Sequence, residues 1–600
     1  MSSLVASYCN IRSKTIAYIV KHGFIFSFFI STLIMVVMWL FGLMRWEGSD
    51  DFIISQLLMG ASGEYTPFVL TVSIILGKIV VNLQRIFPIV NWFTCLEILS
   101  IWSAFIVFEF FVIKHASPRA IPLVTVMLCT IEPLFFLTLQ YTRVAFILPF
   151  AGVLLMFDST LLCLSPEEAI CSLVKLNTAQ NILKAVEGIV GIMLFAFGSL
   201  FRYSCFFAAM AYVGILALCF LVSSVKKHFL QKTSALLTRF LLLLLSALIL
   251  SSGLNHINNR YYRQWENETN YKSYNKIRAD VIDYLPSEYS DSLSSENLSV
   301  SYNDWYMMKC YVINDNTFSY EYFSEVYTNL CSMDNQSHNS DTYNWGQLFN
   351  YRTGRYSGHQ TLFVISCIIV CIAFFASRKN GRISILVNIF GTTLLLCFFL
   401  ARKRLPPWVI DPICFMSLYI ALLFIFQPNE TGNRESTSGI KQSCIKILTS
   451  VVLIVCSLFN LSTVHKYANI EYCDEDLTQL ILLAEESNCV FLLDNISYSP
   501  FPYIDIYGPT YCFELGKWDN IIRVSGWDIG NPEKDRQKAA WGIDSILYSL
   551  VEGKSYLISK NNSSTFNMYE TYFMEHYGIN VCFSLVENCG EYGVYKCSVM

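Results

Sequence analysis

The sequence predicts a polytopic α-helical membrane protein that ends in a small α/β domain, and three observations lead to this fold class. Of the 600 residues, 54% are hydrophobic and 15% are charged, whereas about a quarter of the residues of a soluble protein are charged. The apolar residues gather in blocks of about 20, which is the length that crosses a bilayer. After residue 463, short runs typical of β-strands alternate with helical patterns.

The apolar blocks predict about twelve membrane spans. They cover approximately 22–44, 66–86, 90–113, 120–138, 143–160, 185–201, 205–223, 236–255, 359–377, 383–401, 407–427 and 446–463. Basic residues near span ends, such as Lys232, Arg239 and Arg382, place those loops in the cytoplasm. We therefore expect a cytoplasmic N-terminus and an extracytoplasmic C-terminal region. This requires an odd number of spans, so we expect roughly 11 to 13, and the polar residues of 66–86 make it the weakest candidate.

The spans divide the chain into four regions. Residues 1–255 form an N-terminal transmembrane core, 256–358 an extracytoplasmic loop region, 359–463 a second transmembrane block and 464–600 a C-terminal extracytoplasmic α/β domain. In the last region the predicted strands are Val490–Leu493, Ile521–Val524, Tyr556–Ile558, Val581–Leu585 and Gly593–Cys597, and the predicted helices are Asp474–Glu486 and Thr565–His576. Cysteines of the two exported regions could form disulfides.

Two adjacent acids, Asp50 and Asp51, follow the first predicted span and therefore lie at a membrane surface. A carboxylate at this boundary can act as the general base for an acceptor hydroxyl. The pair could also bind a divalent cation, Mg²⁺ or Mn²⁺, that neutralises a diphosphate. Alternatively, both are ordinary loop acids, or one is the N-cap of a helix over Phe52–Met59.

Several other ionisable residues lie in or beside the predicted spans. Arg143 and Arg202 lie at span ends, where a guanidinium could hold a lipid phosphate or simply reach the headgroup layer. Glu132 falls near the middle of a span and is either a relay or a packing partner of Arg143.

The loop region 256–358 is rich in aromatic and polar residues. Trp265, Arg278 and Asp304 are candidates for substrate binding, because sugars stack on aromatic rings and bond to amides and carboxylates. The alternative is a surface cap packed by its own aromatic side chains. The net charge of −4 gives no basic excess, so we expect no nucleic-acid partner.

The layout resembles the GT-C superfamily of membrane glycosyltransferases, on the residues Ser49-Asp50-Asp51 after the first span, Gln140-Tyr141-Thr142-Arg143 and Gly198–Arg202. This resemblance implies an enzyme of the bacterial cell membrane that works on the outer face. It would transfer a sugar from a polyprenyl-phosphate-linked donor to a glycan acceptor of the cell envelope. By the same resemblance, Asp50 or Asp51 would act as base or metal ligand.

The sequence is also compatible with three other functions. A polysaccharide polymerase or ligase would use the same lipid-linked glycan but depend more on Arg143 and Arg202 than on the aspartates. A transporter or flippase would be expected to carry inverted repeats and charges at the bilayer midplane, and we find no such repeat. A non-catalytic membrane scaffold would lack a pocket that joins the aspartates to the membrane face.

Overall fold

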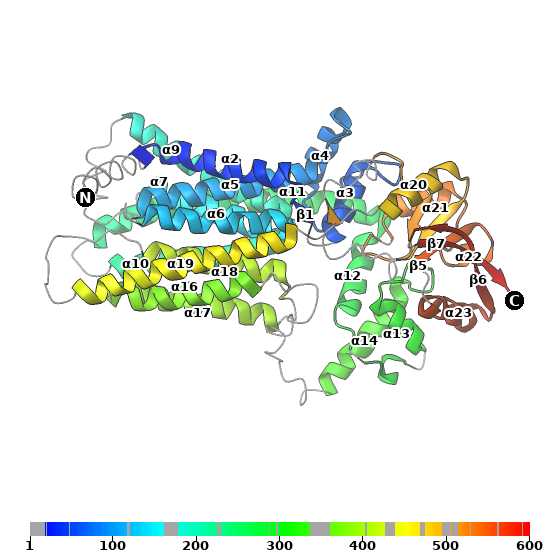
Figure 1. Cartoon of the computed structure of the whole chain (residues 1–600). Coiled ribbons are helices and arrows are strands. Elements are labelled where there is room, and N and C mark those ends of the chain that lie inside the picture. The colour runs from blue at the N-terminus through cyan, green and yellow to red at the C-terminus, as the bar shows by residue number, and fades with distance from the viewer. Residues whose placement is uncertain are drawn as a thin grey trace.

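An elongated bundle of helices ends in a globular head in the computed structural model (Figure 1). The described residues are 18–19, 21–46, 49–116, 120–160, 178–224, 230–286, 288–295, 298–336, 360–377, 379–401, 405–425, 439–468, 475–494, 504–505, 514–528, 530–560, 563–590 and 592–600. The first described residues of the chain lie at the end of the bundle far from the head, and the C-terminus lies in the head.

The bundle accounts for the apolar composition. Its helices are α2 (Gly23–Leu40), α5 (Trp92–His115), α6 (Ile121–Leu137), α7 (Tyr141–Ser159), α9 (Thr178–Phe201), α10 (Tyr203–Ser224), α11 (Leu230–Thr269), α16 (Gln360–Ala376), α17 (Lys379–Ala401), α18 (Pro407–Ile425) and α19 (Gly439–Ala468). Within the described residues, seven of them carry an apolar stretch long enough to cross a membrane and four are shorter apolar helices. These lengths and compositions are those of a membrane-embedded helical protein.

The expected span at 66–86 is wrong. Its helical part is α4 (Ile74–Ile86), which has 13 residues and projects away from the bundle at the end nearest the head (Figure 1). Lys78 and Arg85 lie in this helix, and charged side chains are costly inside a bilayer. Without α4, the described bundle contains an odd number of helices. An odd number is what the expected topology requires, since it places the N-terminus and the C-terminal region on opposite sides of the membrane.

Two helices that matter for the site, α7 and α9, pack backbone against backbone. A Cβ atom on Gly152 would lie 2.5 Å from the carbonyl oxygen of Gly191, and a Cβ on Gly191 would lie 2.7 Å from that of Gly152. Small residues at a helix crossing permit such close approach. The crossing brings the start of α7, Tyr141, next to the residue that follows α9, Arg202.

The head contains a mixed five-stranded sheet. Its order is β4 (Ile521–Arg523), β2 (Val490–Leu493), β5 (Ser555–Lys560), β7 (Tyr592–Val599) and β6 (Val581–Cys589). Strand β2 is parallel to β4 and β5, with Leu492 opposite Ile522 and Leu557, whereas β7 is antiparallel to β5 and β6. The helices that accompany the sheet are α20 (Glu475–Glu486), α21 (Pro532–Ala540), α22 (Tyr548–Val551) and α23 (Ser563–Tyr577). All five predicted strands and both predicted helices of this region are confirmed, with shifts of a few residues at their ends.

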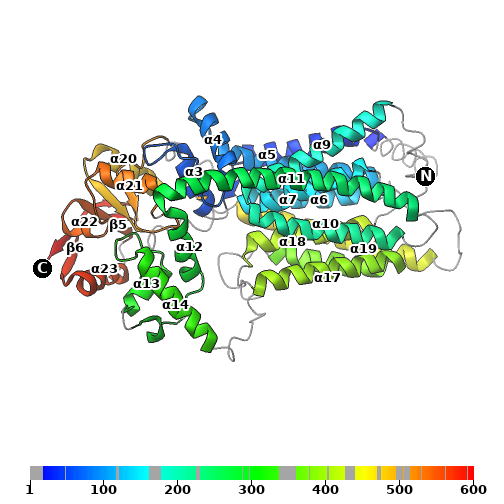
Figure 2. The same ribbon diagram turned by 180° about the vertical axis from the view of Figure 1, so that it is seen from behind.

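The loop region and the C-terminal region share one core. Helices α12 (Tyr271–Ile282), α13 (Tyr302–Lys309) and α14 (Tyr320–Gln336) of the loop region lie beside the sheet domain (Figure 2). Val281 and Phe323 of the loop region belong to the same buried apolar cluster as Leu492 and Tyr572 of the C-terminal region. The two regions therefore make up a single head in the described part of the chain.

Five described cysteines of the head are free thiols, namely Cys310, Cys331, Cys489, Cys582 and Cys597. Cys473 and Cys512 lie outside the described residues.

Candidate functional site

The segment that carries the two aspartates is held between the bundle and the head. Strand β1 (Arg45–Trp46) pairs with β3 (Ile504–Asp505), and the Leu139 N–H donates to the Arg45 carbonyl at 2.7 Å. Trp46 is fully buried. Helix α3 (Ser49–Met59) follows directly, so its first turn lies at the junction of the two parts.

The two neighbouring aspartates have different surroundings. Both lie in the first turn of α3, where a negative charge is favourable next to the helix N-terminus. Asp51 is fully buried, and its Oδ1 accepts the backbone N–H of Tyr141 at 3.1 Å. Glu97 of α5 lies beside it. Asp51 therefore joins α3 to the start of α7, which is a structural role.

Asp50 keeps some exposed surface and accepts hydrogen bonds from two aromatic residues. The indole Nε1–H of Trp527 donates to Oδ1 at 3.0 Å, and the hydroxyl of Tyr141 lies 3.5 Å from Oδ2. Desolvation raises the pKa of Asp50 above its usual value, although Arg202, Trp527, Tyr141 and Arg278 each lower it. A carboxylate with a raised pKa is better matched to proton transfer near neutral pH than an ordinary aspartate.

A polar cavity of about 310 Å³ lies close to this cluster, since Arg202 is one of its lining residues. Two cations line it, Arg202 after α9 and Lys272 in α12, together with Asn255 and Asn259 of α11. The Arg202 guanidinium donates to Thr142 Oγ1 at 2.9 Å and lies 5.6 Å from the centre of the Tyr141 ring. Among the described residues, neither cation forms an ion pair. A cavity lined by two such cations and by amide groups is suited to a phosphate.

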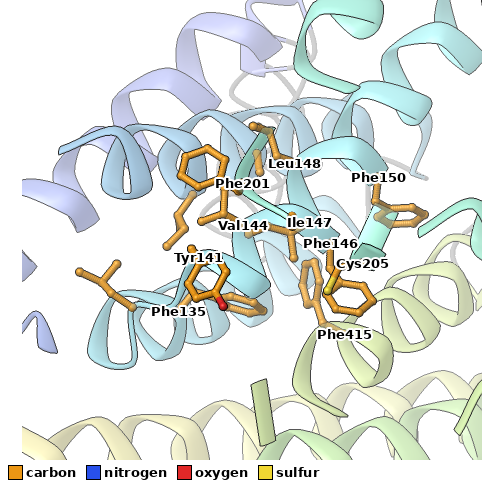
Figure 3. Close-up of a cluster of buried hydrophobic side chains, with 14 of the residues drawn as sticks. Phe135, Tyr141, Val144, Phe146, Ile147, Leu148, Phe150, Phe201, Cys205 and Phe415 are labelled. Carbon is orange, nitrogen blue, oxygen red and sulfur yellow. The ribbon is translucent and has the colours of Figure 1, made fainter. Parts of the chain in front are cut away.

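The packing behind Tyr141 fixes its position. Figure 3 shows it among apolar side chains that include Phe135, Val144 and Phe201. All four side chains are buried. Because close packing restricts the movement of Tyr141, it also fixes the distances from Tyr141 to Asp50 and to Arg202.

Arg143 lies in the bundle and points to another partner. Its Nη2 donates to Asp411 Oδ2 of α18 at 2.6 Å, and its Nη1 donates to the carbonyl of Thr138 at 2.6 Å. Of the two alternatives for Glu132, a relay or a packing partner of Arg143, the second is not favoured, since Glu132 accepts the hydroxyl of Ser31. Arg143 therefore links α7 to α18 and lies outside the cavity.

Replacing Asp411 by alanine should destabilise the protein by about 3–5 kcal/mol, because it leaves the buried Arg143 charge without its partner. Replacing both residues together, as Arg143→Met with Asp411→Leu, should cost much less, since no buried charge then remains. Thermal unfolding of the detergent-solubilised protein measures both. Equal losses in the single and double variants would contradict the structural assignment of this pair.

The three candidates from the loop region separate into one site residue and two structural ones. Arg278 of α12 is close enough to Asp50 to lower its pKa, and it donates to Asn275 Oδ1 at 2.8 Å. Trp265 of α11 stacks on Phe68 with ring centres 4.6 Å apart, so it packs the segment between α3 and α4 against α11. Asp304 closes the capping box of α13 and lies 2.7 Å from His576 Nε2.

The donor sets available to a metal ion are limited. Within the described residues, the cluster with the spacing of a metal site is Asp304, Glu575 and His576. All three of these groups already bond within the protein, since Asp304 contacts His576 and Glu575 accepts the Ser301 hydroxyl at 2.7 Å. Asp50 and Asp51 also fit a cation poorly, because N–H donors already point at one oxygen of each.

Three residues of the site have no clear signal in the sequence. Tyr311 adopts φ = 58°, which is uncommon for a residue with a side chain. Burial raises its pKa to about 12, and Asp283, Arg278 and Asp50 also act on it. Trp527 and Lys272 join the site from parts of the chain far from Asp50, so only the folded structure brings them there.

Comparison with protein-family models and with curated proteins gives no match to this chain.

Proposed function

We propose that the protein is a membrane glycosyltransferase that moves a sugar from a polyprenyl-phosphate-linked donor to a hydroxyl of a cell-envelope glycan, on the outer face of the membrane. One observation carries the proposal. Arg202, which lines the cationic cavity together with Lys272, lies 5.6 Å from the centre of the Tyr141 ring, and the hydroxyl of Tyr141 lies 3.5 Å from Asp50 Oδ2. A phosphate site beside a general base is what this transfer requires.

In the proposed step, the oxygen of the acceptor hydroxyl attacks the anomeric carbon of the donor sugar. Asp50 takes the proton of this hydroxyl at the same time. The bond between that carbon and the phosphate oxygen breaks, and its electron pair stays on the phosphate. The charge that develops there is stabilised by Arg202 and Lys272. The products are the glycosylated acceptor, polyprenyl phosphate and a protonated Asp50.

The position of the cavity is consistent with a lipid substrate. Its lining includes Ser199 and Leu200 at the end of α9 and Asn255 and Asn258 of α11, the helix that runs from the bundle into the head (Figure 2). Nearby on the same helices, Met193 and Ile249 are exposed apolar residues of membrane-length segments. A lipid tail could therefore remain in the bilayer while its phosphate enters the cavity. The resemblance to the GT-C superfamily leads to the same substrate class.

The direct test uses the full-length protein in liposomes that contain polyprenyl-phosphate-linked radiolabelled hexoses and a membrane glycan acceptor. We expect label to appear in the acceptor together with free polyprenyl phosphate. Release of polyprenyl phosphate that proceeds equally well without the protein would contradict the proposal.

Replacing Trp527 by phenylalanine should lower the transfer rate about tenfold and move the acid limb of the pH profile upwards. The lost N–H bond stabilises the Asp50 carboxylate, so its removal raises the pKa of Asp50 further. At a given pH a smaller fraction of the base is then deprotonated. Rates measured across pH give the shift. Trp541→Phe is the matched control, because its indole bonds to the Asp519 carbonyl elsewhere in the head, and an equal shift in both variants would refute this role of Trp527.

A further inference from the structure

A second cleft, of about 420 Å³, lies in the head between the loop region and the sheet domain. Aromatic and amide side chains line it, including Tyr274, Asn314, Asn316 and Tyr320. Its volume falls in the range of about 300–1,000 Å³ that is typical of small-molecule sites. Nothing in the proposed transfer step uses this cleft.

The wall of the cleft is rigid because one acid anchors it. Asp315 Oδ1 accepts the Leu547 N–H at 3.2 Å, its Oδ2 accepts the Tyr577 hydroxyl at 2.9 Å, and Ser545 and Tyr572 also donate to it. Four donors on one carboxylate hold the backbone of this segment in place. The neighbouring amides of Asn314 and Asn316 are therefore presented in a fixed arrangement, which lowers the entropic cost of binding.

Asn314 is further tied to the edge of the sheet. Its Nδ2 donates to the carbonyl of Arg523 at 2.9 Å, and its backbone N–H donates to that of Val524 at 3.2 Å. Asn316 and Tyr320, by contrast, are exposed at the rim. The cleft thus combines a fixed wall with aromatic and amide groups that are open to solvent.

The charges of the cleft are balanced within the protein. Lys538 lies 2.7 Å from Asp535, and both oxygens of Asp315 accept hydrogen bonds. An anionic ligand would therefore gain little here. Aromatic faces with amide donors and acceptors favour an uncharged ligand with many hydroxyls and apolar C–H faces, which is the chemistry of a neutral saccharide.

The cleft is one loop away from Asp50. Gly530, with φ = 74°, forms part of its lining, and Trp527, three residues earlier in the same loop, donates to Asp50. A Cβ atom on Gly530 would lie 3.4 Å from Tyr274, so a side chain there would narrow the cleft. A glycan bound in the cleft could extend past this loop towards the proposed base.

We propose that this cleft binds a neutral saccharide and docks the glycan acceptor for transfer. The acceptor role rests on the proposed function, whereas saccharide binding does not. In this assignment the cleft holds the glycan acceptor, whereas the lipid phosphate of the donor occupies the cavity of Arg202 and Lys272.

Saturation-transfer NMR on the full-length protein in detergent tests the binding, with maltose, lactose, mannobiose and diacetylchitobiose as millimolar probes. We expect saturation transfer to at least one of them, and about tenfold weaker binding in Tyr320→Ala and Asn316→Ala. Tyr327→Ala is the matched control, because Tyr327 is an exposed tyrosine of the same helix α14 that does not line the cleft. No saturation transfer to any of the four probes, or equal binding in the Tyr320 and Tyr327 variants, would overturn the proposal.

The two proposals fail in different ways. Binding that depends on Tyr320 in a protein without transfer activity would keep the saccharide cleft and remove its acceptor role. Transfer that is unaffected by Tyr320→Ala would likewise remove the acceptor role and leave the glycosyltransferase proposal intact. Asp50→Asn should leave saccharide binding unchanged, since Asp50 does not line the cleft.

Discussion

Replacing Asp50 by asparagine should reduce sugar transfer by about 10²- to 10⁴-fold, which is the range that a general base contributes. Asparagine has nearly the same shape and can still accept the indole N–H of Trp527, but it cannot take a proton from the acceptor hydroxyl. The protein should therefore fold and reach the membrane at normal levels. The measurement is transfer of radiolabelled hexose in liposomes at matched protein amounts.

Asp51→Asn is the control for this variant. The Oδ1 of Asp51 accepts the backbone N–H of Tyr141, and an asparagine oxygen accepts the same bond, so we expect transfer to stay within about tenfold of the wild-type rate. The sequence treats the two neighbours alike, whereas the structure separates them. Full activity in both single variants would end the assignment of a carboxylate base in this loop.

Replacing Arg202 by glutamine should reduce transfer by about 10- to 100-fold, because a charged donor to the leaving phosphate is lost. The same change should move the acid limb of the pH profile to higher pH. Arg202 lowers the pKa of Asp50, so its removal raises that pKa and leaves less carboxylate at a given pH. Rates measured across pH at several donor concentrations separate the two effects.

Arg263→Gln is the matched control for Arg202. Arg263 is an exposed arginine in the part of α11 that enters the head, and it does not line the cavity. We expect its rate and pH profile to match those of the wild type. A polymerase or ligase that depends on arginines would respond to Arg202→Gln but not to Asp50→Asn, so the two variants together distinguish these functions.

Local sequence patterns predicted the secondary structure of the head well. Strand β2, for example, occupies the predicted residues Val490–Leu493, since a short run of large apolar residues between polar segments identifies a buried strand. The predicted span at 66–86 failed because apolar content alone does not distinguish a crossing helix from the partly buried α4. The single core of the head could not be predicted either, because it joins residues such as Val281 and Leu492 across the second transmembrane block.

The site was predictable only in part. A charge next to a span marks a membrane boundary, and on this basis the sequence predicts Asp50, Asp51, Arg143 and Arg202 as candidate site residues. Sequence alone could not tell which arginine lies near the aspartates, because the answer depends on Asp411 in α18 and on the crossing of α7 and α9. Trp527 reaches Asp50 across 477 positions of the chain, and no local pattern records such a contact.

We propose that the cavity lined by Arg202 and Lys272 holds the phosphate of a polyprenyl carrier. Native mass spectrometry of the protein with added polyprenyl phosphate tests this most directly, with the wild type compared against Arg202→Gln and Arg263→Gln. We expect the wild type and Arg263→Gln to retain one polyprenyl phosphate under conditions in which Arg202→Gln loses it. Equal retention in all three proteins, or no retention by the wild type, would contradict the claim.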